Sequence, residues 1–177
     1  MKKKCLIFSL LLISLFVFTG CGKKEESTNT KVDISKKLTL TDEGYGTTTF
    51  TYGEDKDYVV KDEHSGKYMT LKVTSEKENF ELELYHTSTY AGSYETGKKN
   101  RSSSDEFKEY TWNGYKGYTY NGTNTSISFN ILLDSSENEE KVLFGSMEYH
   151  NSNDMHVLDT FKSDDFQKLL NSIKFEK

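Results

Sequence analysis

Cysteine is scarce in this sequence, arginine occurs once, and proline does not occur. Cys5 and Cys21 are the two cysteines, and neither lies in the body of the chain. The body therefore has no disulfide framework, no cysteine-rich zinc site, no CxxC redox pair and no cysteine nucleophile. With Arg101 alone, the chain has no cluster of guanidinium groups for bidentate recognition of phosphate or carboxylate. The absence of proline carries little structural weight.

The first 20 residues have the layout of a secretory signal peptide. Three lysines at positions 2–4 precede an apolar run over residues 5–18, which only Ser9 and Ser14 interrupt. The run is 14 residues long, whereas a membrane-spanning helix needs about 20 residues and the hydrophobic region of a signal peptide about 7–15. The length therefore favours a signal peptide over residues 1–20.

Residues 18–21 (Phe-Thr-Gly-Cys) resemble the bacterial lipobox, in which an invariant cysteine follows an aliphatic residue, a small residue, and Gly or Ala. Phe18 departs from the usual leucine. The resemblance implies that Cys21 takes a diacylglyceryl group, that signal peptidase II cuts after Gly20, and that Cys21 becomes the lipidated N-terminus. We therefore expect a lipid anchor in the cell membrane at its extracytoplasmic face, because two acyl chains hold a protein stably. An uncleaved short anchor and an ordinary signal cut elsewhere are the alternatives.

Loss of the leader makes the chain strongly acidic. Without its three lysines the chain keeps 20 basic and 28 acidic residues, a formal charge of −8. Such a chain repels polyanions, so no nucleic-acid partner is expected. Residues 21–36, the lipidated cysteine and a mostly polar stretch, cannot bury enough surface to fold and predict a flexible linker. Residues 37–177 have the length of one globular domain.

Alternation of apolar and polar residues predicts that this domain is rich in β-strands. Residues 49–52, 68–73 and 80–84 alternate in this way, as half-buried strands do. Further strands are expected over residues 125–133 and 141–150, on either side of an acidic turn. Short turns between successive strands favour an antiparallel meander.

An aromatic hairpin is predicted around Asn113-Gly114, the preferred residue pair for a two-residue turn. This turn places Trp112 opposite Tyr115 and Tyr110 opposite Gly117, with the Tyr110 ring over the glycine. The same register places residue 107 opposite residue 120.

One helix is predicted near the C-terminus. Ser163 is a suitable N-cap, two aspartates follow it in the first turn, and apolar residues recur at positions 166, 169, 170 and 173. A short strand is expected over residues 173–175, and a long loop or short irregular helix over residues 90–106. The expected fold class is α+β: a mostly antiparallel sheet with this C-terminal helix packed on it.

The order of these elements resembles the Mog1/PsbP-like domains. The resemblance rests on the opening hairpin at residues 49–52, the Trp112-Asn113-Gly114-Tyr115 turn and the helix-to-strand ending over residues 161–175. These domains pair a curved antiparallel sheet with helices, and in bacteria they often occur as small lipoproteins. The helix that usually follows their opening hairpins is not evident here, because residues 93–104 form helices poorly. The resemblance implies partner binding and transfers no catalytic residues.

The aromatic hairpin is also the candidate binding site. Tyr110, Trp112 and Tyr115 are expected on one face, and if that face is exposed, it forms a platform for a sugar ring or a protein partner. If that face is core, the rings fill the interior, since strands are enriched in aromatic residues anyway.

Strong metal, cofactor or catalytic motifs are absent from the sequence. His150 and His156, with Glu148 and Asp154 nearby, offer metal ligands, but their spacing matches no strong motif and the residues between them are typical of a hairpin loop. The sequence also contains no GxSxG, SxxK, P-loop or GxGxxG motif. We therefore expect no bound metal, no cofactor and no enzymatic activity.

The sequence thus predicts a non-catalytic, lipid-anchored module that binds a protein or another envelope component, such as the cell wall. Binding would use one sheet face or residues 90–106. The alternative is a small-ligand or metal-binding lipoprotein that serves a transporter and uses the concave side of the sheet. An envelope hydrolase would need converging His, Ser and carboxylate groups, which the sequence does not reveal.

Overall fold

The computed structural model describes residues 35–65, 68–151 and 156–177, which belong to one compact unit. The predicted signal peptide, the predicted lipidation site at Cys21 and most of the predicted linker lie outside the described residues. The first strand, β1 (Ser35–Asp42), includes two residues that we expected in the linker. Lys36 belongs to this strand because it pairs with Tyr52 of the neighbouring strand.

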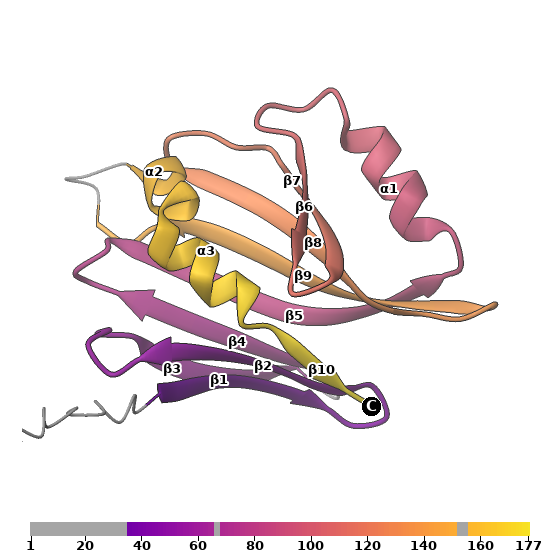
Figure 1. Ribbon diagram of the computed structural model, residues 1–177, viewed down its shortest axis with the longest axis horizontal. Helices are drawn as coiled ribbons and strands as arrows, with labels where there is room; N and C mark the ends of the chain where they lie inside the picture. Colours follow the sequence, from indigo (N-terminus) through magenta and orange to yellow (C-terminus); the bar gives the residue numbers. More distant parts are fainter. Residues whose placement is uncertain (1–34, 66–67, 152–155) are drawn as a thin grey trace, which may run out of the picture. The chain divides into compact units, whose positions relative to one another are not determined.

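The described strands form two antiparallel sheets (Figure 1). The small sheet has the order β1-β2-β10, and the large sheet has the order β3-β4-β5-β9-β8-β7-β6. The remaining strands are β2 (Gly46–Gly53), β3 (Val59–Ser65), β4 (Tyr68–Ser75), β5 (Phe80–Tyr90), β6 (Lys108–Trp112), β7 (Tyr115–Tyr120), β8 (Ser126–Ser135), β9 (Glu139–Tyr149) and β10 (Lys174–Glu176). The helices are α1 (Ser93–Arg101), α2 (Val157–Lys162) and α3 (Asp164–Asn171). The prediction of a mostly antiparallel α+β fold is confirmed.

The large sheet consists of two meanders that meet where β5 pairs with β9. Strands β3, β4 and β5 follow one another, and the chain then crosses by way of α1 to β6 at the far edge. From there it returns through β7 and β8 to β9, which pairs with β5 from Phe80↔Tyr149 to Tyr90↔Glu139. The expected meander is therefore interrupted by one crossover.

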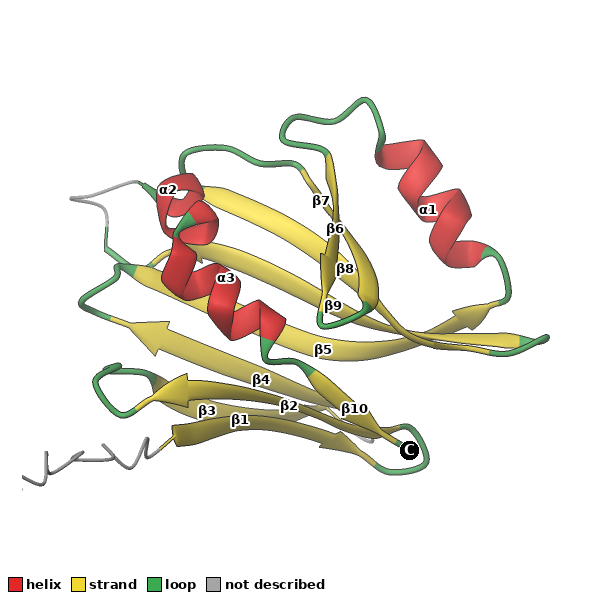
Figure 2. Cartoon of the chain, viewed as in Figure 1, coloured by secondary structure: helices red, strands yellow, loops and turns green. Residues whose placement is uncertain are grey.

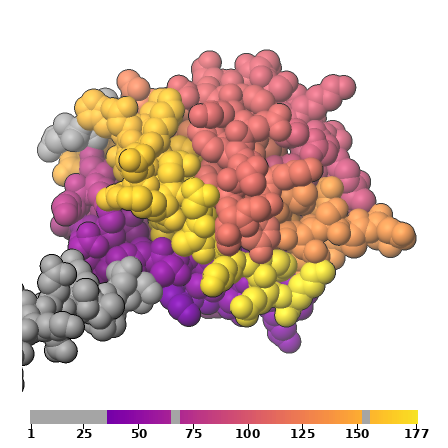
Figure 3. Space-filling model, in the orientation of Figure 1, coloured from indigo at the N-terminus to yellow at the C-terminus, as the bar shows by residue number. Residues whose placement is uncertain are grey.

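The main core lies between the large sheet and a layer made of the small sheet, α2 and α3. Leu38 and Phe50 of the small sheet, Leu82 and Phe129 of the large sheet, and Phe166 of α3 belong to one buried cluster. Figure 2 shows α2 and α3 together, with α1 at a distance from both. On the face drawn in Figure 3, the C-terminal helices and β10 lie directly against the N-terminal strands. The two ends of the described chain thus cover the large sheet jointly.

Helix α1 covers the other face of the large sheet. Neighbouring residues along a strand point to opposite faces, and whereas Leu143 belongs to the main core, Val142 belongs to a second cluster with Tyr94 of α1, Tyr118 and Tyr120. The start of α1 has no side-chain cap of its own. Instead, the buried Glu140 carboxylate of β9 accepts hydrogen bonds from the backbone N–H groups of Gly92 (2.9 Å) and Tyr94 (2.8 Å). A regular helix therefore forms where the sequence indicated a loop or an irregular helix.

The C-terminal helix follows its sequence signals. The Ser163 hydroxyl accepts a hydrogen bond from the Phe166 N–H at 3.3 Å, so Ser163 is the N-cap of α3. The strand that follows is β10, which pairs antiparallel with β2. Both predictions are confirmed, whereas α2 was not anticipated.

The aromatic hairpin has the predicted turn and register. Asn113 and Gly114 both have positive φ angles (48° and 86°), as a type I′ turn requires. Trp112 pairs with Tyr115 and Tyr110 pairs with Gly117, and the described ladder ends at Lys108↔Thr119. The ring over Gly117 belongs to Trp112, however, and not to Tyr110.

A glycine in β9 allows the core to close. A Cβ atom at Gly145 would overlap the ring of Phe129, which is fully buried on the paired strand β8. We expect Gly145→Ala to lower the free energy of unfolding by about 1–3 kcal/mol, the usual cost of overpacking a core. Ser146→Ala, next along the strand, should change it by less than about 0.5 kcal/mol. Equal effects in chemical denaturation would contradict this account of the packing.

Candidate functional site

The predicted aromatic platform lies against the core and not in solvent. Trp112 is only 1% exposed, and its Nε1–H donates to the Oε1 atom of Gln167 in α3 at 3.0 Å. The half-buried Tyr110 ring stacks on Trp112 at a centroid distance of 4.7 Å. Tyr115 uses its hydroxyl to accept a hydrogen bond from the Phe175 N–H of β10. The structure does bring the three residues together. Of the two alternatives, the core alternative holds for Trp112, which is not available to a ligand, whereas Tyr110 and Tyr115 are half-buried.

Two polar clusters that the sequence did not reveal lie at junctions of the fold. The first contains His86 of β5, between Asp42 of β1 and Thr48 of β2. His86 Nδ1 lies 2.7 Å from Asp42 Oδ2, and His86 Nε2 lies 2.7 Å from Thr48 Oγ1. A carboxylate can only accept, so the imidazole donates through Nδ1 and accepts from the threonine hydroxyl through Nε2. All three residues are buried.

The order of groups in this cluster is that of a hydrolase triad: carboxylate, imidazole, hydroxyl. A catalytic hydroxyl must reach the atom that it attacks, and Thr48 has no exposed surface. Asp42 also accepts a hydrogen bond from the Met69 N–H of β4 at 2.8 Å. The cluster therefore ties the small sheet to β4 and β5 of the large sheet and does not present a nucleophile.

Tyr45 and Lys141 pack beside the Asp42–His86–Thr48 cluster. The Tyr45 ring stacks on His86 at a centroid distance of 4.3 Å, and its hydroxyl donates to the carbonyl oxygens of Thr87 (3.0 Å) and Val142 (3.1 Å). Burial raises the pKa of the Tyr45 phenol far above its ordinary value. Lys141 donates to the Tyr45 carbonyl oxygen and lies over its ring at 4.9 Å. The neighbouring cleft, about 520 Å³, is lined by acidic, hydroxyl and aromatic side chains.

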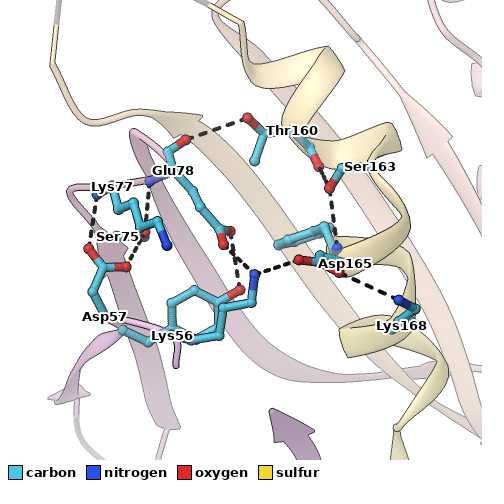
Figure 4. Close-up of polar contacts among 11 residues, drawn as sticks. Lys56, Asp57, Ser75, Lys77, Glu78, Thr160, Ser163, Asp165 and Lys168 are labelled. Carbon is cyan, nitrogen blue, oxygen red and sulfur yellow. Dashed lines mark hydrogen bonds and ion pairs between the residues drawn. The ribbon is translucent and has the colours of Figure 1, made fainter. Parts of the chain in front are cut away.

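The second polar cluster joins the β2–β3 loop, the β4–β5 turn and α3 (Figure 4). Its centre is Lys56, whose side chain is only 16% exposed. The Lys56 ammonium lies 2.6 Å from Glu78 Oε1 and 2.9 Å from Asp165 Oδ2. Burial lowers the pKa of Lys56, but the hydrogen bonds and charges of the two carboxylates outweigh it, so the net shift is upward.

Further hydrogen bonds make this cluster rigid. Asp57 accepts from the Ser75 hydroxyl at 2.6 Å and from the Lys77 N–H at 2.9 Å, and these bonds hold its pKa below the ordinary value. The Tyr58 hydroxyl donates to Glu78 Oε2 at 3.3 Å. Since these groups come from the loop and from the turn, each segment fixes the position of the other.

A cleft of about 390 Å³ opens beside Lys56. Tyr52 and Tyr58 form an aromatic pair along it, with their ring centroids 4.9 Å apart. The Tyr58 ring in turn packs edge-on against Phe80 of the core. The other residues along the cleft are Thr51, Gly53, Asp55, Lys56, Asp165, Lys168 and Leu169. This Tyr52–Tyr58 cleft combines an anchored aromatic wall with charged groups of both signs, which makes it the candidate functional site.

The histidines considered as metal ligands lie in separate interactions. His150 Nδ1 is 2.7 Å from Glu81 Oε1 of β5, and His156 Nδ1 is 3.5 Å from Asp159 Oδ2. Asp154 lies outside the described residues. In the part of the chain that the structure describes, no group of three His, Cys, Asp or Glu side chains is placed to hold a metal ion. In the same part, no helix has the length and apolar character needed to cross a membrane.

No family model, curated protein or solved structure matches this chain.

Sequence reasoning missed both polar clusters because their members are far apart along the chain. Asp42 and His86 are separated by 44 positions, and Lys56 and Asp165 by 109. One signal was present: His86 follows Leu82 and Leu84 on the apolar side of an alternating strand. That alternation could have marked His86 as a buried histidine.

The buried imidazole should make stability depend on pH. Burial, opposed by the Asp42 carboxylate and aided by the Lys141 charge, gives the His86 imidazole a pKa below its ordinary value. The unfolded chain then binds a proton more readily than the native chain. The contribution is fully present above the unfolded pKa of about 6.5, and it is lost as the pH falls from there toward the native pKa.

We expect the free energy of unfolding to fall on acidification from pH 7.5 to pH 5, and to fall less steeply in His86→Gln. His64→Gln, which changes an exposed histidine of β3, should keep the wild-type slope. Urea denaturation at a series of pH values measures both slopes. A His86→Gln slope equal to that of the wild type would show that the imidazole is not the titrating group.

The Lys56–Glu78 pair should be coupled in stability. We expect a double-mutant cycle with Lys56→Met and Glu78→Gln to give a coupling free energy of about 1–2 kcal/mol, because each substitution weakens a charge-assisted hydrogen bond between two largely buried groups. Lys56 keeps Asp165 as a partner in Glu78→Gln, and Glu78 keeps Tyr58 as a partner in Lys56→Met. Lys72 and Glu83, which are more exposed and 3.1 Å apart, provide a matched control pair. Their coupling should be smaller because solvent screens exposed charges. Equal couplings for the two pairs would contradict a structural role for Lys56.

Proposed function

We propose that this protein is a lipid-anchored, extracytoplasmic and non-catalytic binding module for a protein or another envelope component. The observation that carries the proposal is the Tyr52–Tyr58 cleft, a solvent-open recess whose walls are fixed before any ligand arrives. Its aromatic rings and charged groups are held by the core and by ion pairs. Such preorganisation favours binding because little side-chain freedom remains to be lost.

Anchoring at Cys21 rests on the sequence. The 14-residue apolar run and the Phe-Thr-Gly-Cys ending together match a lipoprotein leader. The described fold begins at Ser35, so 13 residues lie between Cys21 and β1. Fully extended, such a segment spans at most about 45 Å, enough for the domain to reach components beside the membrane.

The non-catalytic part of the proposal draws support from the buried triad-like cluster. His86 makes hydrogen bonds to both a carboxylate and a hydroxyl, and its hydroxyl partner Thr48 is inaccessible. A mostly antiparallel sheet with packed helices is the coarse architecture that a Mog1/PsbP-like domain would have, and membership among these domains stays a proposal. In that proposal, α1 would take the place of the helix that such domains usually carry after their opening hairpins.

The anchor is tested by changing the cysteine. We expect Cys21→Ala to release the protein from the membrane fraction, since no diacylglyceryl group can be attached. Cys5→Ala removes the other thiol and should leave the protein in the membrane fraction. Immunoblots of membrane and soluble fractions measure the distribution. Retention of Cys21→Ala in the membrane would refute the lipoprotein assignment.

The binding role is tested by capture. Full-length protein, extracted in detergent and immobilised, is incubated with solubilised envelope proteins and, separately, with cell-wall fragments. Tyr52→Leu removes an aromatic ring from the cleft. Tyr90→Leu, which removes an exposed tyrosine outside the cleft, serves as the control. Binding by the wild type and by Tyr90→Leu, but not by Tyr52→Leu, supports the proposal. Absence of saturable binding in either fraction would contradict it.

A further inference from the structure

We propose that the Tyr52–Tyr58 cleft binds an uncharged saccharide ring of an envelope glycan. The inference rests on the proposed function and names the ligand class of the same site. Three properties of the cleft support this inference. The cleft has an aromatic wall, positively charged donors and negatively charged acceptors that are already held in place by ion pairs, and lining charges that cancel, which favours a neutral ligand.

The aromatic wall suits the apolar face of a sugar. The two tyrosine rings meet at 35°, and Tyr58 is anchored against Phe80, which in turn packs edge-on against Phe166 of α3. The face of an aromatic ring is electronegative, so the slightly positive C–H bonds on one side of a pyranose ring pack favourably on it. Tyr52, which is half-buried and lines the cleft, provides such a surface.

The polar groups of the cleft suit hydroxyl groups. Lys56 is paired with Glu78 and Asp165, and Lys168 lies 3.5 Å from the other oxygen of Asp165. A chain of alternating charges offers donors and acceptors side by side. A hydroxyl group both donates and accepts, so it can join this chain without breaking an ion pair, whereas a charged ligand would compete with the existing partners.

Charge also favours a neutral ligand. Two lysines and two aspartates lie along the cleft, so the charges that line it cancel. The chain without its leader carries a formal charge of −8, and that field opposes the approach of an anionic polymer. The volume of about 390 Å³ falls within the range of roughly 300–1,000 Å³ that is typical of small-molecule sites.

The cleft beside His86 has a different character. Glu43, Glu139 and Asp42 line it, and its one basic side chain among the described residues is the buried imidazole. One face of its Tyr45 ring is occupied by His86, and Lys141 also lies over that ring. Its other tyrosine, Tyr85, packs against Phe144 at a centroid distance of 4.6 Å. Because the charges along this cleft are not balanced, the saccharide is assigned to the Tyr52–Tyr58 cleft.

The test is a titration of the full-length protein in detergent with defined oligosaccharides. The probes are the tetramers of N-acetylglucosamine and of glucose, and a tetramer of galacturonic acid as the charged comparison. Isothermal titration calorimetry and saturation-transfer NMR measure binding. We expect saturable binding of at least one neutral tetramer and weaker binding of the uronic acid.

Variants then locate the site. Tyr52→Leu should weaken binding by at least about tenfold, the loss typical of an aromatic anchor. Asp55→Asn changes an exposed residue of the cleft and should weaken binding by about threefold or more, a loss of roughly 0.7 kcal/mol. Tyr90→Leu should bind as the wild type does. Thermal unfolding by circular dichroism establishes that each variant is folded.

Several outcomes would overturn the inference: no binding of either neutral tetramer, tighter binding of the uronic acid, or wild-type affinity in both Tyr52→Leu and Asp55→Asn. These outcomes are distinct from failure of the proposed function. If a protein from the envelope still binds the wild type and not Tyr52→Leu, the binding module stands and the saccharide assignment falls.

Discussion

The hydrogen-bonded contact between Asp42, His86 and Thr48 is the constraint on which the fold depends. It connects β1 and β2 to β5, and the Asp42 carboxylate extends the connection to β4. Buried polar groups are costly unless they are paired, so this contact admits one alignment of the two sheets. Since Tyr52 lies near the end of β2 and the loop that follows carries Lys56 and Tyr58, the same alignment places the wall of the Tyr52–Tyr58 cleft beside α3.

The aromatic residues are divided between the interior and this cleft. The hairpin at Asn113-Gly114 fastens the C-terminal segment: Asn113 Nδ2 donates to the Ile173 carbonyl at 2.6 Å, and the Tyr115 hydroxyl accepts from the Phe175 N–H at 3.1 Å. Its tryptophan fills the space above Gly117. The hairpin therefore fastens the C-terminal segment, and in the proposed function the tyrosines at the end of β2 and in the loop that follows contact the ligand.

Short sequence patterns predicted the strands and turns that depend on neighbouring residues. They failed where an element or a cluster is stabilised by a residue far away in the sequence. Alternation predicted strands within β2, β4 and β5, Ser163 predicted the start of α3, and Asn113-Gly114 predicted the hairpin register, whereas β3 was not predicted. Helix α1 escaped prediction because its N-terminal N–H groups are satisfied by Glu140, some 46 residues away. Alternation also does not say which face is covered, so Trp112 was assigned a possible role at the surface. The Lys56 cluster could not be foreseen, because its carboxylates come from a turn and a helix that only the tertiary fold brings together.

Hydrogen–deuterium exchange with and without solubilised cell-wall glycan tests the central claim most directly, because it reports where a ligand acts without assuming the site. The account predicts slower exchange over residues 51–58 and 165–169 and unchanged exchange in α1 and in the β6–β7 hairpin. Protection confined to α1 or to the hairpin, with none beside Tyr52, would contradict the assignment of the binding site.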